Sequence, residues 1–163
     1  MVPLDVPTPL EVEDDLKQMV HDLKRWEGLP LRALRALPSV CFWTPSPEER
    51  GDYAGKPTHV VGNTAVRRCI EKAISRTVLE EDWQALAALF TFDELTLTLK
   101  ARQTDAAEHR GVSAETFRKY SERRLLRQFS EEIFRGELEW AVCQSRSLNE
   151  AGDLDTSPSA TGQ

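Results

Sequence analysis

The sequence AAEHRGVSAETFRKY, residues 106–120, predicts two helices joined by a tight corner. Gly111 suits the left-handed conformation that commonly ends a helix. Ser113 is a favourable N-cap residue for the helix that follows it. Ala107, four residues before the glycine, is small enough to let the two helices approach closely. The stretch therefore predicts a helical fold in which one helix ends at Gly111 and another begins directly after Ser113.

The second helix of this corner carries its own apolar pattern. Phe117 lies six residues after the glycine and Tyr120 three residues later, so both are expected to anchor the helix on a core. Val112 is expected to lie beneath the turn. Arg110 stands directly before the glycine, and its long aliphatic stem can cover apolar surface there.

Helical spacing continues along most of the chain. Thr8, Pro9 and Glu11 match a capping box with proline in the first turn, and Gly28 and Pro30 end the helix that starts there. The sequence thus predicts an all-α, multi-helix domain over residues 8–145, with a C-terminal helix-turn-helix followed by a long helix. The further expected helices cover residues 31–37, 64–78, 81–90, 99–110, 114–120 and 122–142, with the helix-turn-helix at about 99–122.

Four segments are expected to lack helices. Residues 38–63 hold four of the nine prolines and three of the eight glycines, which predicts an irregular loop, with a short extended piece at residues 59–61. Residues 1–7 are expected to be a flexible N-terminus. Residues 146–163 are polar and rich in Ser, Gly, Asp and Thr, which predicts a disordered tail. The alternating residues 95–98 are expected to be an extended connector that ends in a helix cap at Thr98.

The charge of the chain is unevenly distributed. The net charge of the 163 residues is −6, but Leu99–Gln128 contains eight basic and four acidic residues, a balance of +4. The remaining residues then carry 13 basic and 23 acidic side chains, a balance of −10. The basic segment includes the predicted corner, whereas the acidic remainder argues against a protein that coats nucleic acid without specificity.

Neither the composition nor the motifs indicate an enzyme. The three histidines are far apart and none shows a zinc-ligand spacing, and no phosphate-binding glycine loop or nucleophile elbow occurs, so we expect no metal and no cofactor. Three scattered cysteines are typical of a reduced, cytoplasmic protein. Without a signal peptide or an apolar run of membrane-spanning length, we expect a soluble protein with no membrane partner.

Residues 99–128 resemble the helix-turn-helix DNA-binding domains of bacterial and phage regulators. The run Gly111-Val112-Ser113, with Thr116 and Arg118, matches the G-V-S-x-x-T-x-R form found among repressors and in the sigma-factor region that binds promoters. The same stretch is similar to a segment of uncharacterised actinobacterial proteins, and this similarity implies no particular activity. The resemblance implies a non-enzymatic protein that binds double-stranded DNA and regulates transcription.

The resemblance also implies roles for individual residues. The recognition helix would be Ala114–Tyr120, and Arg118 would contact a base edge, because arginine can bond guanine through two hydrogen bonds. Ser113, Ala114 and Glu115 would lie on the exposed side, where Glu115 can accept from cytosine. The expected phosphate contacts are Lys119, Arg123, Arg124, Lys100 and Arg102. Gln103 and Thr104 would lie near the start of the first motif helix, where backbone amides can also meet phosphate.

A second interpretation is a helical adaptor whose corner binds a protein partner and never contacts DNA. In that case the arginines of residues 118–127 form a solvated face paired with Glu115, Glu122 and Glu131. A homodimer is a further expectation, since paired half-sites strengthen binding by a short helix-turn-helix. One set of apolar positions on the last helix could form the dimer seam. The alternative, which we favour, is that these positions pack on the upstream helices. This register comprises Leu126, Phe129, Ile133, Gly136 and Trp140.

Overall fold

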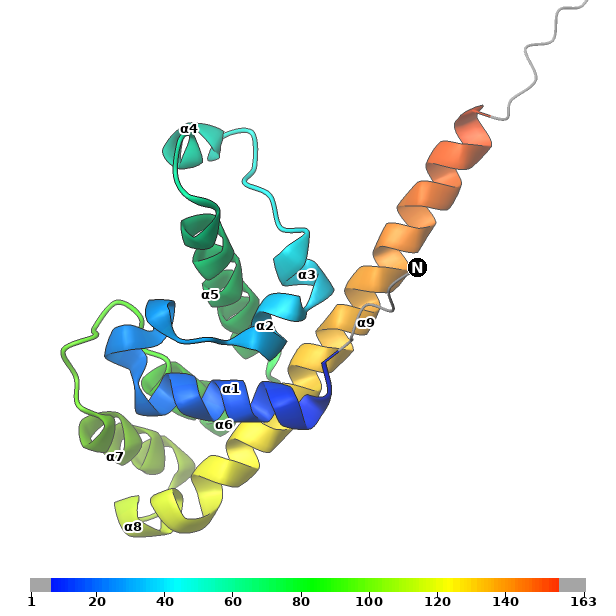
Figure 1. Cartoon of the computed structure of the whole chain (residues 1–163). Helices are drawn as coiled ribbons and strands as arrows, with labels where there is room; N and C mark the ends of the chain where they lie inside the picture. The colour runs from blue at the N-terminus through cyan, green and yellow to red at the C-terminus, as the bar shows by residue number, and fades with distance from the viewer. Residues whose placement is uncertain (1–6, 156–163) are drawn as a thin grey trace, which may run out of the picture.

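The computed structural model describes residues 7–155, and over that range it contains helices and turns but no strand (Figure 1). The all-α prediction is confirmed. The α-helices are α1 Pro9–His21, α2 Arg32–Ala36, α3 Pro38–Cys41, α4 Arg50–Tyr53, α5 Thr58–Arg76, α6 Glu80–Leu89, α7 Leu99–Arg110, α8 Ala114–Thr116 and α9 Glu122–Asp155. A 3₁₀-helix, η1 Leu23–Gly28, follows α1, and a π-helical segment, η2 Phe117–Ser121, joins α8 to α9.

The predicted capping box starts α1. The Thr8 hydroxyl accepts from the amide of Glu11 at 3.3 Å, and the Glu11 carboxylate accepts from the amide of Thr8 at 2.7 Å. Because these bonds satisfy backbone donors that have no partner within the helix, they fix where α1 begins.

Buried apolar side chains from nearly every helix form one cluster around the first half of α9. In Figure 1, α1 crosses α9, and α6 and α7 lie beside this crossing. α4 lies at the top of the view, next to the start of α5. Leu126, Phe129 and Ile133 of α9 are each at most 2% exposed. The favoured interpretation of the α9 register is therefore confirmed for these residues, which pack on upstream helices.

The segment predicted as an irregular loop is partly helical, which corrects the prediction for residues 38–63. It contains α3 and α4, and α5 begins at Thr58, so residues 59–61 are helical and not extended. Long-range contacts order this segment. Trp43 packs edge-on against Tyr53 with ring centroids 5.8 Å apart, and Arg68 of α5 lies over Trp43 and pairs with Glu49 at 2.6 Å.

The connector before α7 consists of turns, and the alternating residues 95–98 form no strand. The Thr98 hydroxyl accepts from the amide of Ala101 at 3.1 Å, as predicted for a helix cap. α7 then runs from Leu99 to Arg110, the range expected from the sequence.

The last helix is longer than predicted. α9 continues to Asp155, so residues 146–155 are helical where their composition predicted a disordered tail. The predicted flexibility of residues 1–6 and disorder of residues 156–163 fall outside the described residues; Pro7, which is described, is buried. No helix within residues 7–155 is both long and apolar enough to cross a membrane.

Candidate nucleic-acid interface

The corner between α7 and α8 has the local geometry that the sequence predicts. Gly111 has a φ of 68°, and its amide donates to the carbonyl of Glu108 at 3.1 Å. The amide of Val112 donates to the carbonyl of Ala107, also at 3.1 Å, which closes the end of α7. The Ser113 hydroxyl accepts from the amide of Thr116 at 3.1 Å and so caps the next helix.

Phe117 anchors the second helix of the corner, but Tyr120 does not. Phe117 is fully buried, as predicted, whereas Tyr120 is 72% exposed. The π-helical segment explains the difference: the amide of Glu122 donates to the carbonyl of Phe117, five residues back. Because a π turn inserts one extra residue, the next inward position after Phe117 becomes Glu122 instead of Tyr120.

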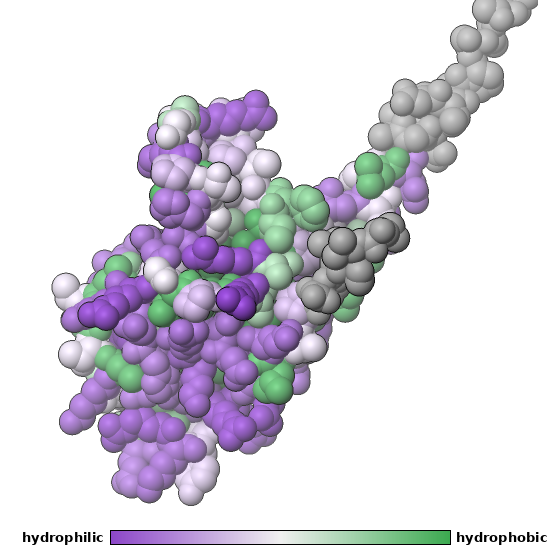
Figure 2. All heavy atoms as spheres, viewed as in Figure 1, coloured by the Kyte–Doolittle hydropathy of each residue, from purple (hydrophilic) through white to green (hydrophobic). Residues whose placement is uncertain are grey.

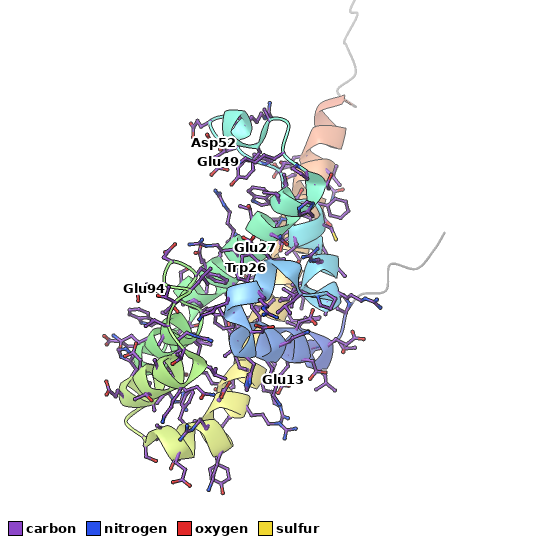
Figure 3. All side chains as sticks on the ribbon, turned by 60° about the vertical axis from the view of Figure 1, so that its left-hand side comes forward. Glu13, Trp26, Glu27, Glu49, Asp52 and Glu94 are labelled. Carbon is purple, nitrogen blue, oxygen red and sulfur yellow. The ribbon has the colours of Figure 1, made fainter. Side chains whose placement is uncertain are left out.

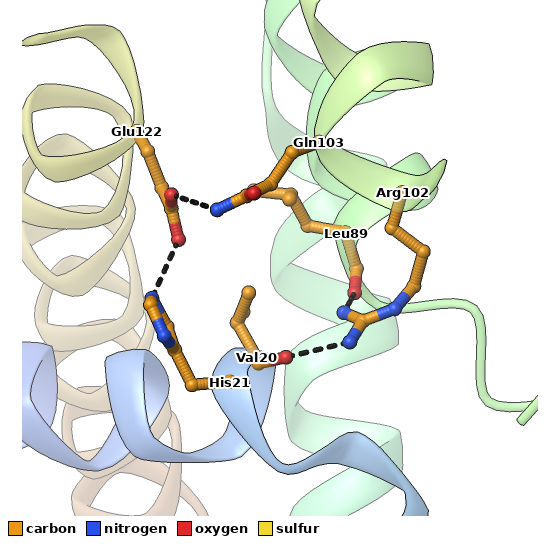
Figure 4. Close-up of polar contacts among 6 residues, drawn as sticks. All are labelled: Val20, His21, Leu89, Arg102, Gln103 and Glu122. Atoms are coloured by element: carbon orange, nitrogen blue, oxygen red, sulfur yellow. Dashed lines mark hydrogen bonds and ion pairs between the residues drawn. The ribbon is translucent and has the colours of Figure 1, made fainter. Parts of the chain in front are cut away.

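Glu122 joins three helices through polar contacts (Figure 4). Its carboxylate accepts from the side-chain amide of Gln103 at 2.7 Å and lies 3.2 Å from Nε2 of His21. Glu122 and Gln103 are both buried, with 6% and 5% exposure. The Gln103 side chain therefore holds α7 to the start of α9 and is not free to contact phosphate, so the contact expected of its backbone amide stays a prediction.

Arg102 is also structural. Its guanidinium donates to the carbonyls of Val20 and Leu89, each at 2.8 Å, at the C-terminal ends of α1 and α6 (Figure 4). Arg102 is only 4% exposed. Burial lowers the pKa of this guanidinium, and the nearby Glu122 carboxylate partly opposes that shift. The predicted phosphate contact of Arg102 is thus wrong, because its donors already satisfy helix-terminal carbonyls inside the protein.

A sequence signal for this burial exists. Residues 99, 102, 103, 106 and 107 recur at steps of three and four, the spacing of one inward face of α7. Ala106 and Ala107 of that face are indeed buried. The same packing accounts for Arg110, whose guanidinium pairs with the mostly buried Asp82 of α6.

Other basic side chains of the segment remain exposed. Arg118, Arg123 and Arg124 are exposed, and none of the ion pairs within the described side chains includes them. Lys119 is exposed and pairs with Glu115 at 2.8 Å. On the face shown in Figure 2, the end of the molecule that α7 and α8 form carries mainly hydrophilic residues.

The remaining predicted site residues lie on α7 and at the start of α8. Lys100 and Thr104 are exposed on α7, and the Thr104 hydroxyl donates to the carbonyl of Lys100 at 2.8 Å. Ser113 is exposed and Ala114 half-buried at the start of α8. We define the α8–α9 basic surface as Ser113, Ala114, Glu115, Arg118, Lys119, Arg123 and Arg124.

A groove of about 630 Å³ borders the basic surface between α1, α7 and α9. Arg118 and Arg123 line it from one side, and Glu13 and Asp14 of α1 line it from the other. Glu13 pairs with Arg127 at 3.5 Å, and Figure 3 shows Glu13 on α1 beside the first turns of α9. The groove therefore mixes both charge signs. Sequence reasoning missed these carboxylates, which precede Arg127 by more than 110 residues.

Comparisons with protein-family models, curated proteins and solved structures found no match to this chain. Within the described side chains, no three His, Cys, Asp or Glu residues cluster so as to hold a metal ion. The surface offers cationic and hydrogen-bonding groups, which suit the binding of an anionic polymer.

Proposed function

We propose that the protein binds double-stranded DNA through the α8–α9 basic surface and acts as a transcriptional regulator. The observation that carries this proposal is a contrast among its arginines. Arg118, Arg123 and Arg124 are exposed and have no carboxylate partner among the described side chains, whereas Arg102 and Arg110 of α7 are engaged by groups of the protein itself. Exposed guanidinium groups on one helical run are available to phosphates and base edges.

The charged residues of the surface have separate proposed tasks. Arg118 would bond a guanine edge, while Arg123 and Arg124 would neutralise phosphates. Glu115 holds Lys119 at 2.8 Å, so this lysine must exchange that contact for a phosphate when DNA binds. Lys100 and Thr104, exposed on α7, would contact the phosphate backbone. Such a role agrees with the cytoplasmic location expected from the cysteines.

Fluorescence anisotropy with a labelled random duplex, followed by selected sites, tests the proposal. Arg123→Ala and Arg124→Ala are expected to weaken binding to every sequence, whereas Arg118→Ala is expected to weaken the preference among sequences. Arg135→Ala is the matched control, because Arg135 is exposed on the same helix and its loss changes the net charge equally. Absence of duplex binding by the wild-type protein at low salt would exclude this function.

The groove beside the surface favours a second candidate, a protein-binding adaptor. Its walls carry both charge signs, and Leu10 at its edge is 61% exposed, a composition that suits a protein partner. The variant Glu13→Gln with Asp14→Asn separates the two candidates. If DNA lies against Arg118, removing these carboxylates removes repulsion of phosphate and strengthens duplex binding several-fold. An adaptor shows no duplex binding before or after this change.

A further inference from the structure

The C-terminal part of α9 leaves the helical domain (Figure 1). Its last aromatic contact with the domain is made by Trp140, which stacks on Phe42 of the α3 end with ring centroids 6.1 Å apart. Every residue from 141 to 150 is exposed. We call residues 141–155 the α9 extension.

A helix in this position needs a packing partner. Isolated helices of about 15 residues are marginal in water even when their sequences favour helix formation. The α9 extension contains Ser145, Ser147, Asn149 and Gly152, which are weak helix formers. The extension continues the packed first half of α9, and a partner along its surface would stabilise these weak positions.

One face of this part of α9 is apolar. Leu138, Ala141, Val142, Ser145 and Leu148 follow one another at steps of three, one, three and three, so they lie in one stripe, which we call the α9 stripe. Leu138, Val142 and Leu148 are 69%, 52% and 73% exposed. Figure 2 shows hydrophobic residues among hydrophilic ones on this projecting part of α9.

The α9 stripe points away from the rest of the domain. Ile133 is buried in the core and Trp140 stacks on Phe42, so these two residues mark the side of α9 that faces the domain. At 100° per residue, Leu138, Val142 and Ser145 lie about 120–180° around the helix from these two residues, and Ala141 and Leu148 about 60–100° from them. No other helix within residues 7–155 is therefore placed to cover the stripe.

We propose that the α9 stripe pairs with the same stripe of a second copy of this chain in an antiparallel arrangement. Four of the five stripe residues are placed symmetrically about Cys143: Leu138 and Leu148 lie five residues before and after it, and Ala141 and Ser145 lie two, while Val142 mirrors Gln144. A two-fold axis at that level brings Leu138 against Leu148 of the partner subunit at both ends of the seam. Small residues next to the axis let the two helices approach closely.

Charge selects the antiparallel direction. The C-terminal end of the α9 extension carries Glu150, and no basic residue occurs between Arg146 and residue 155. A parallel pair would set these acidic ends beside each other, where like charges repel. The antiparallel pair separates them to opposite ends of the seam and opposes the two helix dipoles.

This inference goes beyond DNA binding and is tested without DNA. Sedimentation equilibrium of the full chain is expected to show a monomer–dimer equilibrium at concentrations up to about 100 μM. Leu138→Glu with Leu148→Glu should shift the protein to monomer, because each dimer would bury four added charges. The matched control, Cys143→Glu with Ser147→Glu, adds the same charge on the other side of α9 and should leave the dimer intact. A wild-type chain that stays monomeric, or equal dissociation by both double variants, overturns the proposal.

Disulfide trapping tests the direction. In a chain with Cys41→Ser and Cys143→Ser, which keeps the mostly buried Cys69, two variants are prepared, one with Leu138→Cys and one with Leu148→Cys. When the two are mixed with oxidised glutathione, the antiparallel pair predicts mixed disulfides between the two variants. Disulfides between identical variants alone would contradict it, because they require Leu138 to meet Leu138 of the partner subunit.

Discussion

Replacing Arg102 with methionine tests whether this arginine stabilises the fold or binds DNA. Methionine keeps the long apolar stem but removes the donors that reach the carbonyls of Val20 and Leu89 at 2.8 Å. Each buried carbonyl left without a partner costs about 1–3 kcal/mol, so the two together cost about 2–6 kcal/mol. Part of this loss is offset, because the folded protein no longer buries a guanidinium whose Nε has no hydrogen-bond partner. We expect a net destabilisation of about 3 kcal/mol.

Urea denaturation followed by circular dichroism at 222 nm measures this change in the free energy of unfolding. In thermal denaturation, the same loss should lower Tm by roughly 6–12 °C for a chain of this size. The control is Lys100→Met, which removes one positive charge from an exposed position of the same helix and should change stability by less than about 0.5 kcal/mol.

Equal stabilities of Arg102→Met and Lys100→Met would refute the reasoning. The outcome most damaging to it is an Arg102→Met protein of wild-type stability that no longer binds duplex. That result would place the guanidinium at a phosphate, as the sequence predicted, and not inside the protein.

Three further predictions concern the corner and the core. Gly111→Ala should cost about 1 kcal/mol, because φ is 68° and an added Cβ meets no atom within 4 Å, so only the backbone is strained; a neutral result in urea denaturation would contradict the left-handed cap. Phe117→Ala should destabilise by about 3–5 kcal/mol, whereas Tyr120→Ala should change stability by less than about 0.5 kcal/mol, and the reverse order would place Tyr120 in the core. Burial, aided by the charge of Glu137, raises the pKa of the Cys69 thiol to about 12. At pH 8 a thiol reagent should therefore label the exposed Cys41 and Cys143 quickly, and Cys69 only when the protein unfolds. Three equal labelling rates would show that Cys69 is accessible.

The sequence predicts those parts of the fold that local interactions determine. The limits of α7 follow from the Thr98 cap and from Gly111, and both act within one turn of the helix end. Residues 38–63 were predicted less well because their order depends on distant partners, such as the contact of Arg68 with Glu49. The composition of this segment contains no signal for such a contact.

The candidate site shows the same division. The corner could be located from small residues and caps, but the carbonyls that bind Arg102 belong to residues 82 and 13 positions away in the chain. The π-helical segment that turns Tyr120 outward leaves no mark in helix propensity or apolar spacing. Exposure of Arg118, Arg123 and Arg124 follows only once the inward face of this helical run is known.

The salt dependence of duplex binding tests the proposed function most directly. Each phosphate contact contributes about 0.9 to the slope of log K against log salt concentration. The Arg123→Ala, Arg124→Ala double variant should therefore show a slope about 2 units shallower than that of the wild-type protein, while Arg135→Ala keeps the wild-type slope. Identical slopes for all three proteins, or no duplex binding by the wild-type protein at low salt, would contradict DNA binding through the α8–α9 basic surface.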